Sequence, residues 1–269
     1  MVKKVGTNKD DTIYGTNHGD VISGKGGNDH LIGGVGNDKV YGDAGNDELY
    51  ASGGKDLLDG GAGFDLVNLY FSKRGVHYTV GQSEISFQDF DGNRGTSTLK
   101  SMEAVAGSTF NDVLMGSKGE NYINGNLGND QIDGRAGDDV LFNGGGKDTI
   151  TGGSGDDFFG FNGDKITVTK ITDFNVADDS FMFKNALFEE LQGVGRSHTV
   201  HYNTYRSIDA AQIQIGDAHD ALDADIRIIY DQTDGYLYYD LDGSGADKAT
   251  AVAFIGKDLA LTENDFFVY

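Results

Sequence analysis

The chain has 269 residues, a formal net charge of −22 and a pI of about 4.3, which excludes nucleic acid as a partner because too few cations are present to neutralise its phosphates. It contains no cysteine and no proline but 42 glycines, which excludes disulfides and leaves glycine, asparagine and aspartate to make the turns. No apolar stretch approaches the roughly 18 residues of a membrane-spanning helix, and the acidic balance favours cations as partners.

A nine-residue unit repeats thirteen times in the first 160 residues. Units begin at residues 6, 15, 24, 33, 42, 51 and 60, and again at residues 107, 116, 125, 134, 143 and 152. The first position is glycine in eleven units, and the eighth position is apolar in all thirteen. A short strand with one inward side chain cannot bury that side chain alone, so the repeat predicts stacked copies in a parallel solenoid.

The sixth position of the unit carries an aspartate, or in one case an asparagine. Its residues are Asp11, Asp20, Asp29, Asp38, Asp47, Asp56, Asp65, Asp112, Asn121, Asp130, Asp139, Asp148 and Asp157. Stacked carboxylates repel one another unless a cation lies between them. Ordinary turn formation is the alternative explanation, although turns alone would also accept serine or glycine here. The column therefore favours cation binding.

The repeat resembles the calcium-binding nonapeptide GGxGxDxUx of the RTX (repeats-in-toxin) family, as in GGVGND (33–38) and GDAGND (42–47). The resemblance implies an all-β fold, a right-handed parallel β-roll with eighteen residues per coil. It also implies calcium ions between unit n and unit n+2, held by the sixth-position side chains and by backbone carbonyls. Calcium suits such sites because it accepts six to eight oxygen ligands in flexible geometry.

The carbonyl ligands that the resemblance implies lie in the turns that match the pattern best. They belong to Gly24, Gly26, Asn28, Gly33, Val35, Asn37, Gly42, Ala44, Asn46, Gly60, Gly125, Leu127, Asn129, Gly134, Ala136, Asp138, Gly152 and Ser154. Seven units allow five n/n+2 pairs and six units allow four, so at most nine calcium ions are expected.

The first turns of each block depart from the pattern. Lys9, His18 and Phe110 replace the fourth glycine, and Asn121 replaces a carboxylate by an amide. We therefore expect these turns to be caps with weak or empty sites.

The sequence divides into four segments. Residues 1–68 and 107–160 are the repeat blocks, and residues 69–106 and 161–269 lack the repeat. Alternation such as VHYTV predicts that residues 69–106 form enlarged coils that continue the solenoid. In residues 161–269 we expect a β-rich cap over the last coil, with a short helix at 184–193 and a hairpin that turns at Thr233–Gly235.

The C-terminal region has a resemblance of its own. Residues 220–256 resemble the C-terminal region of serralysin-type secreted proteases, and the last five residues, DFFVY, resemble the end of type I secretion substrates. The N-terminus lacks the apolar core of a cleavable signal peptide. The resemblance implies a type I exporter as a partner and an extracellular location.

Catalysis is not indicated by the sequence. The HExxH zinc helix of metalloproteases and the GxSxG elbow of lipases are both missing. We expect a non-catalytic protein that binds calcium after export, folds on binding, and acts on an extracellular glycan, membrane or host surface. The alternative is the C-terminal export and folding module of a larger secreted protease, lipase, epimerase or adhesin. A third reading is an enzyme with an unfamiliar site.

Overall fold

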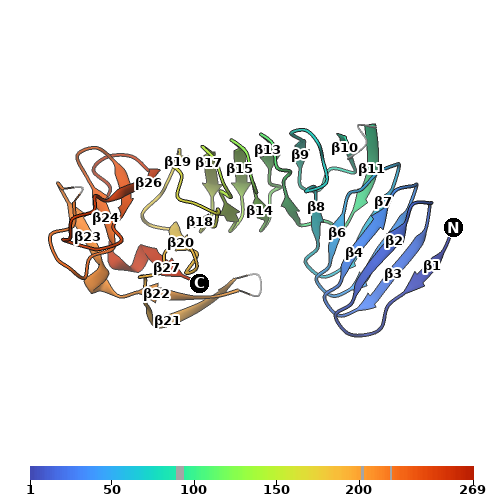
Figure 1. Ribbon diagram of the computed structural model, residues 1–269, viewed down its shortest axis with the longest axis horizontal. Coiled ribbons are helices and arrows are strands. Elements are labelled where there is room, and N and C mark those ends of the chain that lie inside the picture. Colours follow the sequence, from blue (N-terminus) through green and yellow to red (C-terminus); the bar gives the residue numbers. More distant parts are fainter. Residues whose placement is uncertain (89–93, 201–202, 219) are drawn as a thin grey trace. The chain divides into compact units, whose positions relative to one another are not determined.

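The computed structural model describes residues 1–88, 94–200, 203–218 and 220–269. Within these residues it consists of strands and two short 3-10 helices, η1 (Ala210–Gln212) and η2 (Glu263–Asp265), without an α-helix. No helix in this part of the chain has the length and apolarity needed to cross a membrane. The chain divides into two compact units, Met1–Gln131 and Ile132–Tyr269, which are described separately (Figure 1).

The first unit is built from short strands stacked side by side. They are β1 (Lys3–Val5), β2 (Thr12–Thr16), β3 (Val21–Gly26), β4 (His30–Gly34), β5 (Lys39–Ala44), β6 (Glu48–Tyr50), β7 (Leu57–Ala62), β8 (Leu66–Asn68), β9 (His77–Thr79), β10 (Glu84–Gln88), β11 (Arg94–Lys100), β12 (Ala104–Ala106), β13 (Val113–Met115) and β14 (Tyr122–Asn124). Alternate strands belong to different sheets, in the orders β1-β3-β5-β7-β11-β10 and β2-β4-β6-β8-β12-β14, and β9 pairs with β13.

Parallel pairing sets an eighteen-residue coil. Ile22 lies opposite Val40, and Leu31 lies opposite Leu49. Two strands and two turns therefore complete each coil, which confirms the predicted all-β parallel roll.

The eighth residue of each nine-residue repeat points into the interior. The side chains that are 2% exposed or less are Ile22, Leu31, Val40, Leu49, Leu58, Val67, Leu114, Ile123, Ile132, Leu141, Ile150 and Phe159. Ile13 in the first coil is only partly buried. Within each compact unit, one inward side chain per strand thus makes a continuous core, because each coil covers the apolar residue of the next.

Residues 69–106 add strands to both sheets of the first unit. Strand β11 pairs in parallel with β7, and β12 pairs in parallel with β8. Strand β10 turns back antiparallel on β11. The interior is filled here by larger side chains, with Tyr78 0% exposed and Phe87 1% exposed.

The second unit combines further coils with hairpins. Its strands are β15 (Gln131–Ala136), β16 (Val140–Phe142), β17 (Thr149–Ser154), β18 (Phe158–Phe161), β19 (Thr169–Ile171), β20 (Ser180–Phe183), β21 (Gly193–Val200), β22 (Asn203–Ile208), β23 (Ile213–Gly216), β24 (Ile228–Asp231), β25 (Tyr236–Tyr239), β26 (Thr250–Phe254) and β27 (Phe266–Val268). Within the unit their orders are β16-β18-β20-β27-β22-β21 and β15-β17-β19-β26-β25-β24-β23.

Strand β27 lies inside its sheet. It pairs in parallel with β20, where Phe181 is opposite Phe266, and antiparallel with β22. The ring centroids of Phe174 and Phe181 are 4.2 Å apart in a stacked arrangement, and those of Phe181 and Phe266 are 5.5 Å apart. Aromatic packing of this kind closes the core of the second unit.

The helix predicted at residues 184–193 is wrong. The Phe188 N–H donates to Lys184 O at 3.0 Å and the Leu191 N–H donates to Phe188 O at 3.0 Å, which makes isolated turns. Phe188 is fully buried, with its ring centroid 5.0 Å from those of Phe183 and Tyr239. Burial of this ring overrides the local helix propensity. The hairpin is present as the antiparallel pair β24 and β25.

Replacing Leu49 by alanine should lower the free energy of unfolding by about 2–5 kcal/mol, because Leu49 is 0% exposed and its loss leaves a cavity between stacked coils. Chemical denaturation in saturating calcium measures the loss. The control is Leu222→Ala, a 77% exposed side chain, which should change stability by less than about 0.5 kcal/mol. Equal effects of the two substitutions would contradict the inward column.

Candidate functional site

The sixth-position side chains form columns with a step of eighteen residues. In the first compact unit one column holds Asp11, Asp29, Asp47 and Asp65, a second holds Asp20, Asp38 and Asp56, and a third holds Asp112 and Asp130. In the second compact unit Asp139 and Asp157 form a column. Asn121 and Asp148 are buried in their own turns, 1% and 2% exposed. The structure therefore brings most of the predicted side chains together, with one side chain per coil in each column.

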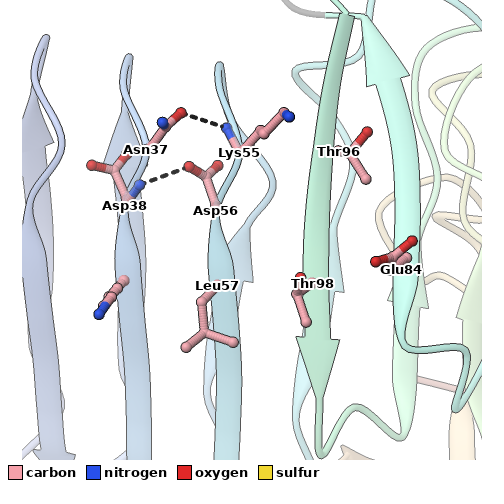
Figure 2. Close-up of a pocket in the computed structure, with 9 residues that line it drawn as sticks. Asn37, Asp38, Lys55, Asp56, Leu57, Glu84, Thr96 and Thr98 are labelled. Carbon is pink, nitrogen blue, oxygen red and sulfur yellow. Dashed lines mark hydrogen bonds between the residues drawn. The ribbon is translucent and has the colours of Figure 1, made fainter.

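One oxygen of most of these carboxylates accepts a hydrogen bond from the neighbouring coil. The Asp38 N–H donates to Asp56 Oδ1 at 2.9 Å, beside a matching bond from the Lys55 N–H to Asn37 Oδ1 at 2.9 Å (Figure 2). The same bond joins Asp47 N–H to Asp65 Oδ1 at 2.9 Å. These bonds fix the orientation of the carboxylates that accept them.

The other carboxylate oxygen has no hydrogen-bond partner within the described part of the chain. This holds for the buried Oδ2 atoms of Asp29, Asp38, Asp47, Asp56, Asp65 and Asp157. We call the turns that end in these six aspartates open turns. A buried polar atom without a partner is costly, so each open turn requires a proton or a cation.

The first glycine of an open turn marks where such a cation fits. A Cβ atom at Gly33 would lie 2.6 Å from Asp38 Oδ2, and one at Gly24 would contact Asp29 Oδ2 and lie 2.9 Å from Gly42 O of the next coil. A carboxylate oxygen and a carbonyl oxygen therefore face the same small space, which glycine leaves clear; the open turn 51–56 begins instead with Ala51.

Six of the first-position carbonyls predicted as ligands lie beside a first glycine, and those of Gly42 and Gly60 face the open turns 24–29 and 42–47. Those of Gly24, Gly33, Gly42, Gly60, Gly125 and Gly152 each approach the first glycine of the preceding coil. No group of three or more histidine, cysteine, aspartate or glutamate side chains gathers among the described residues. Most ligands must then be carbonyls, and an all-oxygen set fits calcium.

Backbone conformation keeps the open turns open. Five of them have a positive φ at the second residue, namely Lys25 (80°), Gly34 (94°), Asp43 (74°), Gly61 (105°) and Gly153 (110°). The N–H of that residue is directed away from its own aspartate: the Gly34 N–H, for example, donates to Ser52 Oγ at 3.2 Å.

Four other turns are closed by their own second residue. The N–H and the hydroxyl of Thr16 both donate to Asp20 Oδ2, at 2.8 and 2.7 Å. Corresponding N–H bonds close the turns 6–11, 107–112 and 116–121, from Thr7, Ser108 and Ser117. These are the turns that begin each repeat block. A closed turn already satisfies its carboxylate or amide oxygen and does not need a cation.

Burial raises the pKa of most of the buried column aspartates, including Asp112 in a closed turn. Burial raises the pKa of Asp47 and Asp157 to about 6, and the pKa of Asp56 and Asp65 to about 7. Hydrogen bonds from Thr16 instead lower the pKa of Asp20. The open turns therefore carry carboxylates that are short of positive charge.

Two acidic residues of the columns were not predicted from the repeat. The Asp65 N–H donates to Glu103 Oε2 at 2.9 Å, and the Asp157 N–H donates to Asp179 Oδ1 at 3.1 Å. Neither turn contains the glycines of the repeat. The one feature that they share with the repeat is an acidic residue two positions before a buried apolar residue, Glu103 before Val105 and Asp179 before Phe181.

Comparison with known proteins identifies the repeat. Residues 5–31, 32–67, 106–141 and 142–163 match the family model of the RTX calcium-binding nonapeptide repeat. The chain is similar to the solution structure of the AlgE6R3 subunit of the Azotobacter vinelandii mannuronan C5-epimerase, with 23% identity over 58% of this chain and 77% of that one and a TM-score of 0.33. It is also similar to the crystal structure of the extracellular lipase LipA from Serratia marcescens, with 15% identity over 98% of this chain and 40% of that one and a TM-score of 0.32. No curated protein matches the chain.

The calcium-free fold should be more stable at about pH 5 than at about pH 7.5. The pKa values of Asp47, Asp56 and Asp65 are raised in the folded state, so that state binds more protons than the unfolded one. Their contribution is complete below about pH 4, the ordinary range of aspartate, and is lost as pH rises through 6 to 7. The folded fraction in chelator at both pH values, measured by circular dichroism, tests it. Stability that rises with pH in chelator would contradict the assignment.

Replacing Asp38 by alanine should lower the number of bound calcium ions, because Asp38 Oδ2 is unpartnered and faces the cation position. Replacing Asp20 by alanine should leave that number unchanged, because Thr16 already satisfies its Oδ2. Native mass spectrometry of the two variants counts the ions. Equal losses would show that open and closed turns do not differ in calcium binding.

Proposed function

Because residues 5–67 and 106–163 form an RTX calcium-binding β-roll, we propose that the protein is secreted and folds when it meets calcium outside the cell. The observation that carries the proposal is the set of buried, unpartnered carboxylate oxygens in the open turns. Without cations these turns combine desolvation with like-charge repulsion along each column. Calcium removes both penalties at once.

The calcium concentration on the two sides of a cell membrane supports this order of events. In a cytosol with submicromolar calcium, a net charge of −22 opposes compaction and favours a disordered chain. Extracellular calcium-binding modules have dissociation constants of about 10⁻⁴–10⁻³ M, which suits them to fill only outside. Ion binding to the folded form alone then stabilises that form.

Export through a type I system is the route that fits the sequence. Residues 265–269 resemble the terminus of proteins that such exporters read, and a disordered chain is the state that can thread a channel. The exporter is accordingly a proposed partner.

We also propose that the protein is non-catalytic. The acidic groups whose pKa burial raises to about 6 or 7 are Asp47, Asp56, Asp65, Asp157 and Asp179. All of them belong to the columns, where their acidity follows from stacking and burial. A raised pKa is thus a property of the roll here and does not single out a general acid.

Adding calcium to the protein in chelator should convert coil to β-structure in far-UV circular dichroism, because each open turn then gains its missing positive charge. Asp47→Ala should shift the transition to higher calcium. Asp217→Ala is the matched control, since Asp217 is exposed and lies outside the repeats, and should leave the transition in place. A full β-signal in chelator at neutral pH would disprove calcium-coupled folding.

A further inference from the structure

Glu103 occupies the place of a repeat aspartate although no repeat is recognisable around it. Val105 lies opposite Val67, which places Glu103 two residues before an inward apolar residue. The Ala104 N–H donates to Asp65 O at 3.0 Å, just as the Leu66 N–H donates to Asp47 O at 2.8 Å one coil earlier. Backbone register therefore makes Glu103 the successor of Asp65 in its column.

The turn that carries Glu103 is shorter than a repeat turn. Ser101 takes the position of Gly60, because a Cβ at Gly60 would contact Ser101 O, so only residues 101–103 span what residues 60–65 span in the previous coil. Ser101 has a φ of 49°, which reverses the chain within this short turn. Glutamate is one methylene longer than aspartate, and Glu103 Oε2 still accepts the Asp65 N–H at 2.9 Å.

The space between these two turns has the features of an open turn. Asp65 is 0% exposed, and its Oδ2 has no hydrogen-bond partner among the described residues. A Cβ at Gly60 would contact both Asp65 Oδ2 and Ser101 O, as a Cβ at Gly42 would contact Asp47 Oδ2 and Gly60 O. A carboxylate oxygen and a carbonyl oxygen thus face one space here too.

Among the described residues, no basic side chain forms an ion pair with either acid. The ion pairs formed by the described residues are His30 with Glu48 and Lys100 with Asp59, and neither includes Asp65 or Glu103. Two neighbouring acids, one of them fully buried, are unfavourable without a cation between them.

We propose that turn 60–65 and residues 101–103 hold a further calcium ion, with Glu103 as the acidic ligand from the second coil. This inference rests on calcium binding by the roll, but it lies beyond the matched repeats, which stop at residue 67 and resume at residue 106. Asp65 Oδ2, Ser101 O and the Glu103 carboxylate supply oxygens. The short turn offers fewer carbonyls than a repeat turn, so water completes the shell and the site is weaker than its neighbours.

Native mass spectrometry of the full chain at saturating calcium tests the proposal. Glu103→Gln retains an acceptor for the Asp65 N–H but removes the charge, and should bind one calcium ion fewer than the wild-type chain. Glu103→Asp retains the charge but shortens the reach, and should also lose one ion. Glu84→Gln is the matched control, because Glu84 is an exposed acid on strand β10, outside the aspartate columns (Figure 2), and should keep the wild-type count.

The outcomes separate this inference from the proposed function. A wild-type chain that binds no calcium would overturn both. Wild-type counts in both Glu103 variants, with calcium-induced circular dichroism intact, would overturn only the Glu103 site and leave Glu103 a structural acceptor. If Glu103→Gln does not fold, Glu103→Asp alone decides, because it keeps the charge of the column.

Discussion

The burial of one carboxylate per turn, each above the next, is the constraint on which the rest of this structure depends. One oxygen of most column carboxylates accepts an N–H from the adjacent coil, at distances such as 2.7 Å for Asp38 and 3.0 Å for Asp157. In the open turns the other oxygen has no hydrogen-bond partner among the described residues. The folded chain therefore contains sites that need a cation but does not itself provide the positive charge. The stability of the roll then depends on the calcium concentration of the solution as well as on the contacts within the chain.

An aspartate in the middle of a column takes part in contacts with two coils, the one before it and the one after it. Asp47 Oδ1 accepts the Asp29 N–H from the coil before, while Asp47 Oδ2 faces the space that it shares with Gly60 O of the coil after. Ordering one of these contacts orients the ligand of the next, so neighbouring sites are coupled as in other repeat proteins. Closed turns such as 15–20 stand at the beginning of the repeats and give the column a first carboxylate that is ordered without an ion.

The register and the core could be predicted from the sequence because a strict period determines both. Asp38 and Leu49 follow from their places in the unit alone. Glu103 could not be predicted, since its turn is three residues shorter and has no glycine to reveal it. From the sequence we attribute the distinct first turns to Lys9, His18 and Phe110 at the fourth position, whereas in the structure the backbone N–H of the second residue makes the closing bond. Such bonds depend on local φ, which the repeat does not encode.

The position of β27 inside its sheet determines when that sheet can form. A sheet usually gains its latest strand at an edge, but residues 266–268 lie between β20 and β22, so this sheet cannot close until they have been synthesised. Phe266 and Phe267 are also part of the segment that resembles an export address, and closing the sheet buries them to 0% and 5% exposure. Completion of the sheet therefore hides the apolar side chains of this segment, so a partner can reach them only before the sheet has closed.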